Sequence, residues 1–274
     1  MMDSSLSRPV GAPALVEVEL HDCVATLTLN RPDKRNALSL GVIGELRAAF
    51  ESLPDAVRAV VLSGRGEHFC AGLDLSELTE TSPAEGLMHS RSWYEVFDRI
   101  QFGRRPVVCV MHGAVVGGGL ELASVAHVRV AERSAYFGLP EGQRGIFLGG
   151  GGSVRVSKLI GGSRVAEMML TGRVYNAEEA FQVGLTHYTV PDGEGLARGL
   201  ELARRIASNA PLSNFAIMQA LPLIAEQPMA HGLLTEGLMA AVTQSDGEAK
   251  ARMRAFLEKR VAKVTPPEAR VSNA

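Results

Sequence analysis

The chain has few aromatic residues, few cysteines and little net charge, and each shortage argues against a class of function. Its 274 residues include 28 Lys and Arg against 30 Asp and Glu, a formal net charge of −2, so we expect no basic surface for nucleic acid. Aromatic residues make up only 5%, which also weakens base stacking as a binding mode. No apolar run approaches the ~18 residues of a membrane span, so we expect no membrane insertion.

Cysteine usage and the N-terminus point to a reducing compartment. Cys23, Cys70 and Cys109 are odd in number and stand apart in apolar surroundings. Buried free thiols explain such a set better than a disulfide framework or a metal site. The first residues lack a basic segment followed by an apolar one, which a secretory signal requires, so we expect a disordered tail at 1–14 and a cytoplasmic protein.

Several motifs of common enzyme classes are also missing. The chain has no HExxH or CxxC pattern, and no metal site is predicted. The glycine-dense run at 145–152 lacks the GK[ST] ending of a phosphate loop, and no GxGxxG follows a predicted strand. No GxSxG elbow is present. Nucleotide hydrolysis, dinucleotide redox chemistry and serine esterase chemistry therefore have no support.

What the chain does have is a cluster of glycines beside an acid. Residues 106–121 read PVVCVMHGAVVGGGLE, and the first apolar run fits a strand buried on both faces. The glycines at 117–119 permit positive φ and close approach of a ligand to the backbone. If a helix begins there, its free N–H groups face the ligand, and Glu121 follows within one turn. This stretch predicts an anion cradle next to a carboxyl group.

The order of apolar patterns predicts an α/β core followed by helices. We expect a hairpin from strands at 16–20 and 23–29, and a helix at 88–102 after a polar loop at 79–85. Ser39 is an expected helix cap, and Asn176 and Glu179 have the spacing of a capping box. Short strands alternate with amphipathic helices as far as Val190, which implies parallel pairing through crossovers. Beyond Asp192 the sequence favours helix formers and no strand is expected. We therefore predict an α/β core at 15–192, a helical region at 193–262 and a disordered tail at 263–274.

Six segments resemble, in the same order, those of the crotonase (enoyl-CoA hydratase/isomerase) superfamily. They are LNRPDKRNALS at 29–39, HFCAGLDL at 68–75, PVVCVMHGAVVGGGLELA at 106–123, FGLPEG at 137–142, TGRVYNAEEAFQVGL at 171–185 and AFLEKR at 255–260. The resemblance covers nearly everything from 16 to 260. It implies a crotonase/ClpP-like α/β spiral of repeated β-β-α units with a C-terminal helical trimerisation region. It also implies a homotrimer or a dimer of trimers.

The resemblance further implies roles for individual residues. Glu121 and Glu141 match the two acids that hydratases use together. The backbone N–H groups of Ala71 and Gly118 match the two donors to the thioester oxygen. An acyl-CoA thioester is the implied substrate, with coenzyme A as part of it and no separate cofactor. The positions that match contacts with substrate or coenzyme A are Ala71, Gly72, Leu73, Asp74, Gly118, Phe256 and Lys259.

The residues by themselves allow plainer interpretations. Glu121 could be an acid favoured by the dipole of a helix's first turn, and Glu141 could be a solvated loop acid. Lys34 and Arg35 could meet coenzyme A phosphates or merely be solvated. His112 is expected to satisfy a backbone hydrogen bond. His127 stands where many relatives have Asp.

The pair of acids favours hydration of a 2-enoyl-CoA, as in fatty-acid β-oxidation. The segment 139–147 looks more like a branch that includes methylthioacryloyl-CoA hydratase, which hydrates and then hydrolyses its thioester, so that activity stays an alternative. From a different class, some relatives bind RNA or serve as non-catalytic assembly subunits. The acidic balance and the intact acid pair argue against that role.

Overall fold

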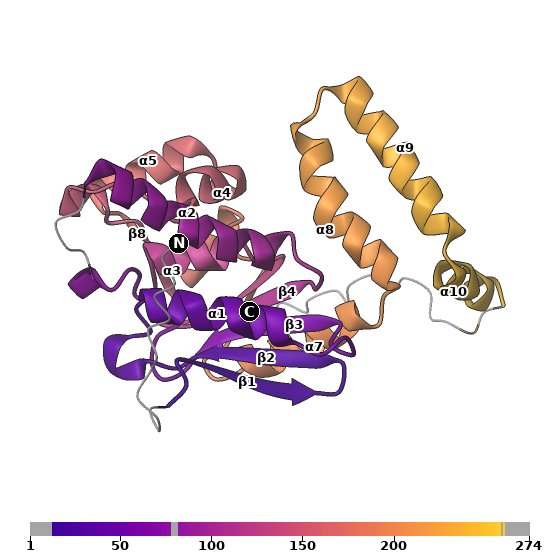
Figure 1. Ribbon diagram of the computed structural model, residues 1–274, viewed down its shortest axis with the longest axis horizontal. Helices are drawn as coiled ribbons and strands as arrows, with labels where there is room; N and C mark the ends of the chain where they lie inside the picture. The colour runs from indigo at the N-terminus through magenta and orange to yellow at the C-terminus, as the bar shows by residue number, and fades with distance from the viewer. Residues whose placement is uncertain (1–12, 78–81, 259, 261–274) are drawn as a thin grey trace, which may run out of the picture. The chain divides into compact units, whose positions relative to one another are not determined.

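The computed structural model describes residues 13–77, 82–258 and 260. It divides into two compact units, one within 1–209 and one within 210–274. The first is a mixed α/β unit (Figure 1). The second consists of the helices α8 (Pro211–Glu226), α9 (Met229–Ser245) and α10 (Gly247–Leu257). Within the described ranges, no helix combines the length and the apolar character that crossing a membrane would require.

A six-stranded sheet forms the centre of the first unit. Its strand order is β1 (Val16–His21), β2 (Val24–Leu29), β3 (Ala59–Gly64), β4 (Val107–Met111), β6 (Val128–Glu132) and β9 (Tyr188–Val190). β1 and β2 form the predicted antiparallel hairpin, and every other neighbouring pair is parallel. The strand β4 is buried along its whole length, as its continuous apolar run predicts.

Helices cover both faces of this sheet because successive side chains of each strand alternate between them. On β3, Val60 and Leu62 belong to the larger core cluster, which also includes side chains of α1 (Leu40–Ser52) and α2 (Pro83–Gln101). Ala59 and Val61 belong to a second cluster, which α7 (Gly195–Ala207) completes.

The position of α7 changes the expected domain boundary. The sequence placed the boundary after Asp192, because no strand follows β9. The buried face of α7, with Leu202 and Ala203, packs against β3 and β4, so this helix belongs to the first unit and the division falls after Asn209. The expected tails at 1–14 and 263–274 lie almost wholly outside the described residues.

A second, three-stranded sheet produces the spiral. It consists of β5 (Ala114–Val116), β7 (Tyr136–Gly138) and β8 (Val174–Asn176). β4 continues into β5 through Gly113, whose φ is +52°, and β6 is likewise followed by β7 in this sheet. The helix α3 (Gly118–Ser124) then follows β5. This strand, strand, helix order is the β-β-α repeat that was predicted.

Shorter elements complete the first unit, and their ends follow local capping signals. They are α4 (Gly152–Ile160), α5 (Gly162–Thr171), α6 (Ala177–Gln182) and the 3₁₀ turns η1 (Pro32–Lys34), η2 (Leu75–Glu77) and η3 (Gly142–Arg144). Asn176 and Glu179 form the predicted capping box of α6, and Ser39 caps α1 as expected. The helix predicted from Met88 begins earlier, at Pro83, because Ser82 and Glu85 form a capping box that the polar composition concealed.

Candidate active site

The helix α3 carries the first predicted acid at the end of a glycine turn. Gly117, with a φ of +53°, ends β5 and lets α3 begin at Gly118. The Glu121 side chain lies in the first turn and is buried. Its Oε1 accepts hydrogen bonds from the backbone N–H groups of Gly150, at 2.9 Å, and Gly152, at 2.8 Å. The glycine-dense run at 145–152, for which the sequence predicted no contact with an acid, therefore holds this carboxyl group.

Only glycine lets this loop approach the acid so closely. A Cβ added to Gly150 would lie 2.9 Å from Glu121 Oε2, and one added to Gly152 would lie 2.7 Å from Glu121 Cγ. Both distances are shorter than real Cβ contacts, so a larger residue would displace either the loop or the acid.

The second predicted acid reaches the same place from the other sheet. β5 and β7 pair in parallel, and the N–H of Gly117 donates to the Gly138 carbonyl at 2.9 Å. Glu141 follows β7 closely, and its side chain is buried. A Cβ added to Gly117 would lie 2.7 Å from Glu141 Oε1, so this carboxyl group lies against the residue that caps α3. Glu141 Oε2 is buried and has no hydrogen-bond partner.

The surroundings of the two acids favour their neutral forms. Burial raises the pKa of Glu121 to about 7, and the charge of Glu141 adds to this effect, whereas the Gly150 and Gly152 N–H groups and Arg155 oppose it. Burial also raises the pKa of Glu141, against the opposing effects of its own backbone N–H and of Arg144. A carboxyl group whose pKa lies near neutrality, as that of Glu121 does, can take up and release protons at neutral pH, as general acids and bases must.

The prediction that Ala71 supplies one of the two thioester-binding N–H groups is wrong. The Ala71 N–H donates to the Arg35 carbonyl at 2.9 Å. Two positions further on, Leu73 forms a parallel bridge with Leu38. Leu38 N donates to the Gly72 carbonyl at 2.7 Å, and Asp74 N donates to the Leu38 carbonyl at 2.9 Å. In this pattern the N–H of the bridged residue points away from its partner strand.

Leu73 replaces Ala71 as the N–H group beside Gly118. A Cβ added to Gly118 would lie 3.4 Å from the Leu73 nitrogen, which places the two residues side by side. Gly118 is the first residue of α3, so its own N–H has no partner within the helix. Two backbone donors therefore lie together at the start of α3, beside the two acids.

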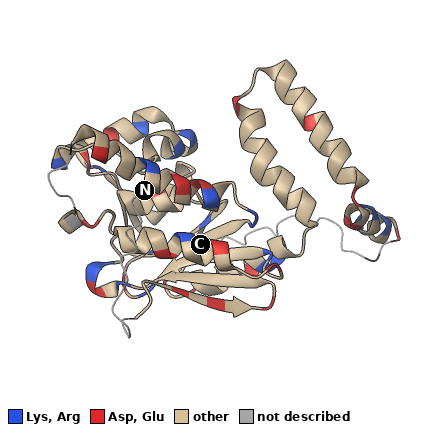
Figure 2. Cartoon of the chain, viewed as in Figure 1, with Lys and Arg blue, Asp and Glu red and all other residues tan. Residues whose placement is uncertain are grey.

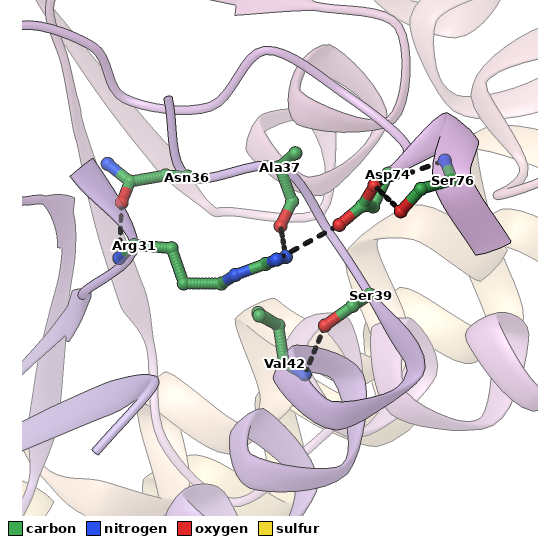
Figure 3. Close-up of polar contacts among 7 residues, drawn as sticks. All are labelled: Arg31, Asn36, Ala37, Ser39, Val42, Asp74 and Ser76. Atoms are coloured by element: carbon green, nitrogen blue, oxygen red, sulfur yellow. Dashed lines mark hydrogen bonds and ion pairs between the residues drawn. The ribbon is translucent and has the colours of Figure 1, made fainter. Parts of the chain in front are cut away.

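A polar network fixes the loop that carries Leu73 (Figure 3). Arg31 Nη2 contacts Asp74 Oδ2 at 3.0 Å, and Asp74 Oδ1 accepts a 2.6 Å bond from the Ser76 hydroxyl. The bond from Ser76, together with Arg31, holds the pKa of Asp74 below its ordinary value. Arg31 Nη1 also donates to the Ala37 carbonyl at 2.8 Å. The Asp74 carboxylate thus ties the loop to the segment at 31–37, and its contact with coenzyme A stays a prediction.

Two histidines noted in the sequence form hydrogen bonds within the fold, whereas the coenzyme A contacts expected of two C-terminal residues stay predictions. His112 Nε2 bonds the Gly66 carbonyl at 2.9 Å, as expected. His127 Nδ1 accepts from Val107 N and its Nε2 bonds Gln101 O, so the residue that departs from the family pattern joins β4 to α2. Phe256 is exposed on α10 in the second unit, and Lys259 lies outside the described residues. Their contact with coenzyme A stays a prediction.

Sequence reasoning missed the residues that support the acids. It named Leu73 only as a contact with substrate or coenzyme A, and it assigned no contact with an acid to Gly150 or Gly152. It also named no contact for the ring of Trp93, the single tryptophan of the chain, which lies against two site glycines. A Cβ on Gly118 would lie 3.0 Å from its Cζ3, and one on Gly150 would lie 3.1 Å from its Cε3. The available signal was the density of glycines at 145–152, which indicates close backbone approach without naming the partner.

Two further observations concern the candidate metal ligands and the cysteines. Among the described residues, no group of three or more His, Cys, Asp or Glu side chains could hold a metal ion. All three cysteines are free, and Cys70 and Cys109 are buried. Burial raises the pKa of the Cys70 thiol to about 12. These thiols therefore pack as apolar groups.

Comparison with known proteins gives this site a family. Residues 19–265 match the family described as enoyl-CoA hydratase/isomerase. The chain is 33% identical over 256 residues to enoyl-CoA hydratase EchA19 of Mycobacterium tuberculosis, across 91% of this chain and 95% of that protein. It is 34% identical to 2,3-dehydroadipyl-CoA hydratase of Escherichia coli, across 86% of this chain and 93% of that protein.

A solved structure gives the same result. A Rhodopseudomonas palustris protein, described as a candidate enoyl-CoA hydratase, matches with a TM-score of 0.88 and 56% identity, across 92% of this chain and 98% of that one. The chain therefore belongs to the enoyl-CoA hydratase/isomerase family, the crotonase superfamily, and has its fold.

Proposed function

We propose that the protein is an enoyl-CoA hydratase, a hydro-lyase that adds water across the C2=C3 double bond of a 2-enoyl-CoA thioester. The observation that carries this proposal is the meeting of two buried acids, Glu121 and Glu141, beside the backbone donors at the start of α3. The names of the relatives in Mycobacterium tuberculosis and Escherichia coli support the same reaction.

The two backbone donors would activate the substrate. The N–H groups of Gly118 and Leu73 bind the thioester oxygen, so negative charge that develops there is stabilised and C3 becomes electrophilic. Preorganised donors of this kind act on the enolate-like transition state more than on the ground state, and losing one typically costs ~3 kcal/mol. The close approach of the Leu73 nitrogen to Gly118 supports a shared role for the two N–H groups.

The two acids would divide the proton transfers. Glu121 is the base that takes a proton from water as the oxygen adds to C3, and Glu141 is the acid that protonates C2. The two N–H bonds to Glu121 Oε1 favour its carboxylate form and leave Oε2 available to water. A pKa of about 7 lets the Glu121 carboxyl group gain and lose a proton near neutral pH. The unpartnered Oε2 of Glu141 is free to face a substrate carbon.

Binding of coenzyme A is proposed for the loop at 71–74 and for Phe256 and Lys259. Coenzyme A is part of the substrate, and the acid–base chemistry needs no separate cofactor. A cytoplasmic location and a role in fatty-acid metabolism accompany this proposal.

A homotrimer or a dimer of trimers is the proposed assembly. The helices α8 and α9 carry few charged residues, as Figure 2 shows. They expose the large apolar residues Phe215, Ile217, Leu221, Leu223, Met229, Leu233, Leu234, Leu238 and Val242. Apolar surface of this extent is typical of subunit interfaces. Light scattering coupled to gel filtration tests the assembly, and a monomer at micromolar concentration would overturn it.

One assay separates hydration from its nearest alternative. Crotonyl-CoA and methylthioacryloyl-CoA are each incubated with the purified protein, and loss of the enoyl absorbance and release of free coenzyme A are followed in parallel. We expect hydration of crotonyl-CoA without release of the thiol. Stoichiometric release with methylthioacryloyl-CoA would instead establish the combined hydratase and thioester hydrolase. If neither reaction occurs and the protein binds RNA in a salt-sensitive way, the protein is an RNA-binding member of this fold and not a hydratase.

A further inference from the structure

The guanidinium of Arg155, in α4, joins the end of α2 to the glycine loop that holds Glu121. Its Nε donates to Gln101 Oε1 at 2.7 Å, and its Nη2 contacts Asp98 Oδ1 at 2.5 Å. Its Nη1 donates to the Gly150 carbonyl at 3.1 Å. The Arg155 side chain is only 13% exposed, whereas that of Asp98 is 54% exposed. An enclosed cation thus has one partner in the loop and two on α2.

The carbonyl that Arg155 binds lies between the two N–H groups that bind Glu121. The Gly150 N–H precedes this carbonyl along the chain and the Gly152 N–H follows it, and both donate to Glu121 Oε1. Gly151, between them, has a φ of +94°, and a Cβ on it would collide with Arg155 Nη1. The guanidinium therefore closes around a turn of glycines, whose backbone has more freedom to lose than that of any other residue.

We propose that Arg155 is the positioning residue of the Glu121 base: held by Asp98 and Gln101, it fixes the turn at 150–152 that directs two N–H groups onto one carboxylate oxygen. This inference rests on the proposed hydratase function, because it assigns a support to the acid of that reaction. Arg155 does not itself contact the reacting atoms. It acts on them through the loop and through its charge.

The charge of Arg155 gives the proposal a measurable signature. Two charged groups act on Glu121: Glu141 raises the pKa of Glu121, and Arg155 lowers it. Loss of the Arg155 charge therefore raises the pKa of Glu121 further above its present value of about 7. Because a base must be ionised to act, the acidic limb of the kcat/KM profile then moves to higher pH.

Three substitutions separate geometry from charge. Arg155→Gln removes both the guanidinium donors and the positive charge. We expect kcat to fall about 100-fold with KM little changed, as for a misplaced catalytic group. Arg155→Lys keeps the charge but cannot bind three partners, so we expect a lower kcat with the acidic limb near its original pH. Asp98→Asn leaves Arg155 in place and should lower kcat less than either.

Arg164→Gln is the matched control. Arg164 also donates from Nη1 to a helix-end carbonyl, that of Ile160, at 2.8 Å. It does not contact the Glu121 loop, so its loss should leave kcat and the acidic limb unchanged. If Arg164→Gln lowers kcat as much as Arg155→Gln, the effect is general destabilisation and the proposal fails.

A titration of Glu121 by ¹³C NMR makes the test independent of turnover. The full-length protein is labelled at its glutamate carboxyl carbons, and the Glu121 signal is assigned by its absence in Glu121→Gln. We expect the titration midpoint to rise in Arg155→Gln and to stay near its original value in Arg155→Lys. An unchanged midpoint in Arg155→Gln would overturn the inference, even if wild-type protein hydrates crotonyl-CoA. If the wild type hydrates no enoyl-CoA, the proposed function fails whatever the titration gives.

Should Arg155→Gln fail to fold, Arg155→Lys and Asp98→Asn carry the test. Arg155→Lys keeps a positive charge at this position, and Asp98→Asn keeps the arginine itself. If both fold and retain wild-type kcat, Arg155 does not position the base.

Discussion

The two segments that supply the acids hold their carboxyl groups in different ways. In α3, Glu121 is fixed by a helix and by two backbone N–H groups on one oxygen. In the turn after β7, Glu141 lies just before the 3₁₀ turn η3, and one of its oxygens is buried without any partner. A carboxyl group fixed in place suits the orientation of a small molecule such as water. One with an unused polar atom suits direct transfer of a proton to the substrate.

Replacement of Glu121 should give the largest effect, because it removes the fixed member of the pair. In Glu121→Gln the amide oxygen can still accept the two N–H bonds, so folding should survive while the base is lost. We expect kcat for hydration of crotonyl-CoA to fall by about 10³- to 10⁴-fold, with thioester binding retained. Steady-state kinetics and circular dichroism measure the two properties. Near-normal hydration by this variant and by Glu141→Gln would refute the assignment of both acids.

Glu141→Gln should have a large but smaller effect, about 10²-fold in kcat. It also tests the coupling between the two segments. The charge of Glu141 raises the pKa of Glu121, so its removal should lower the Glu121 midpoint below about 7. The ¹³C titration detects this shift, whose direction is opposite to that expected for Arg155→Gln. An unchanged midpoint would mean that the two acids act independently.

Gly152→Ala should displace the Glu121 carboxyl group and leave the turn that carries Glu141 unchanged. The added Cβ would lie 2.7 Å from Glu121 Cγ, so the carboxyl group must move. We expect kcat to fall about 10- to 100-fold, as for a small misplacement of a catalytic group. Gly44→Ala is the control: a Cβ there has no neighbour within 4 Å, and alanine favours a helix, so melting temperature should rise and kcat should not change. Equal losses of kcat in both variants would contradict the account.

The pH dependence of the wild type should be the mildest test. Glu121 must be ionised to act as the base, and its pKa is about 7. The value of kcat/KM should therefore decrease as the pH falls below about 7, approaching tenfold per pH unit. Initial rates of hydration across pH 5 to 9 measure this limb, with stability checked at each pH. A flat profile down to pH 5 would show that Glu121 titrates lower or is not the base.

Much of the fold could be predicted because its signals are local. Ser39 and the pair Asn176 and Glu179 cap helices through bonds to residues three positions away, so the sequence contains both partners together. The start of α2 at Pro83 was missed, although its capping box is equally local, because the polar stretch was interpreted as a loop. The predicted core at 15–192 left out α7, because an amphipathic pattern does not show which surface the apolar face of a helix covers.

The sequence pointed to the two acids of the candidate site but not to the groups that support them. Glu121 and Glu141 and the glycines before α3 are recognisable from short motifs. Leu73 rather than Ala71 has the available N–H because the loop forms a bridge to Leu38, which is far away in sequence. This bridge decides which N–H groups of the loop already donate hydrogen bonds within the fold. Gly150 and Gly152 likewise acquire their role only from contact with Glu121.

By itself the sequence determined the strands, most of the helices, the family and the two candidate catalytic acids, because hydrophobic periodicity, capping and short motifs are properties of neighbouring residues. The tertiary structure decided what each of those residues faces. Parallel pairing of β5 with β7 brings Glu141 against the start of α3, and Arg155 joins α2 to the loop that holds Glu121. Such contacts join segments distant in sequence, so burial, the availability of a backbone N–H and a raised pKa arise only when the chain has folded.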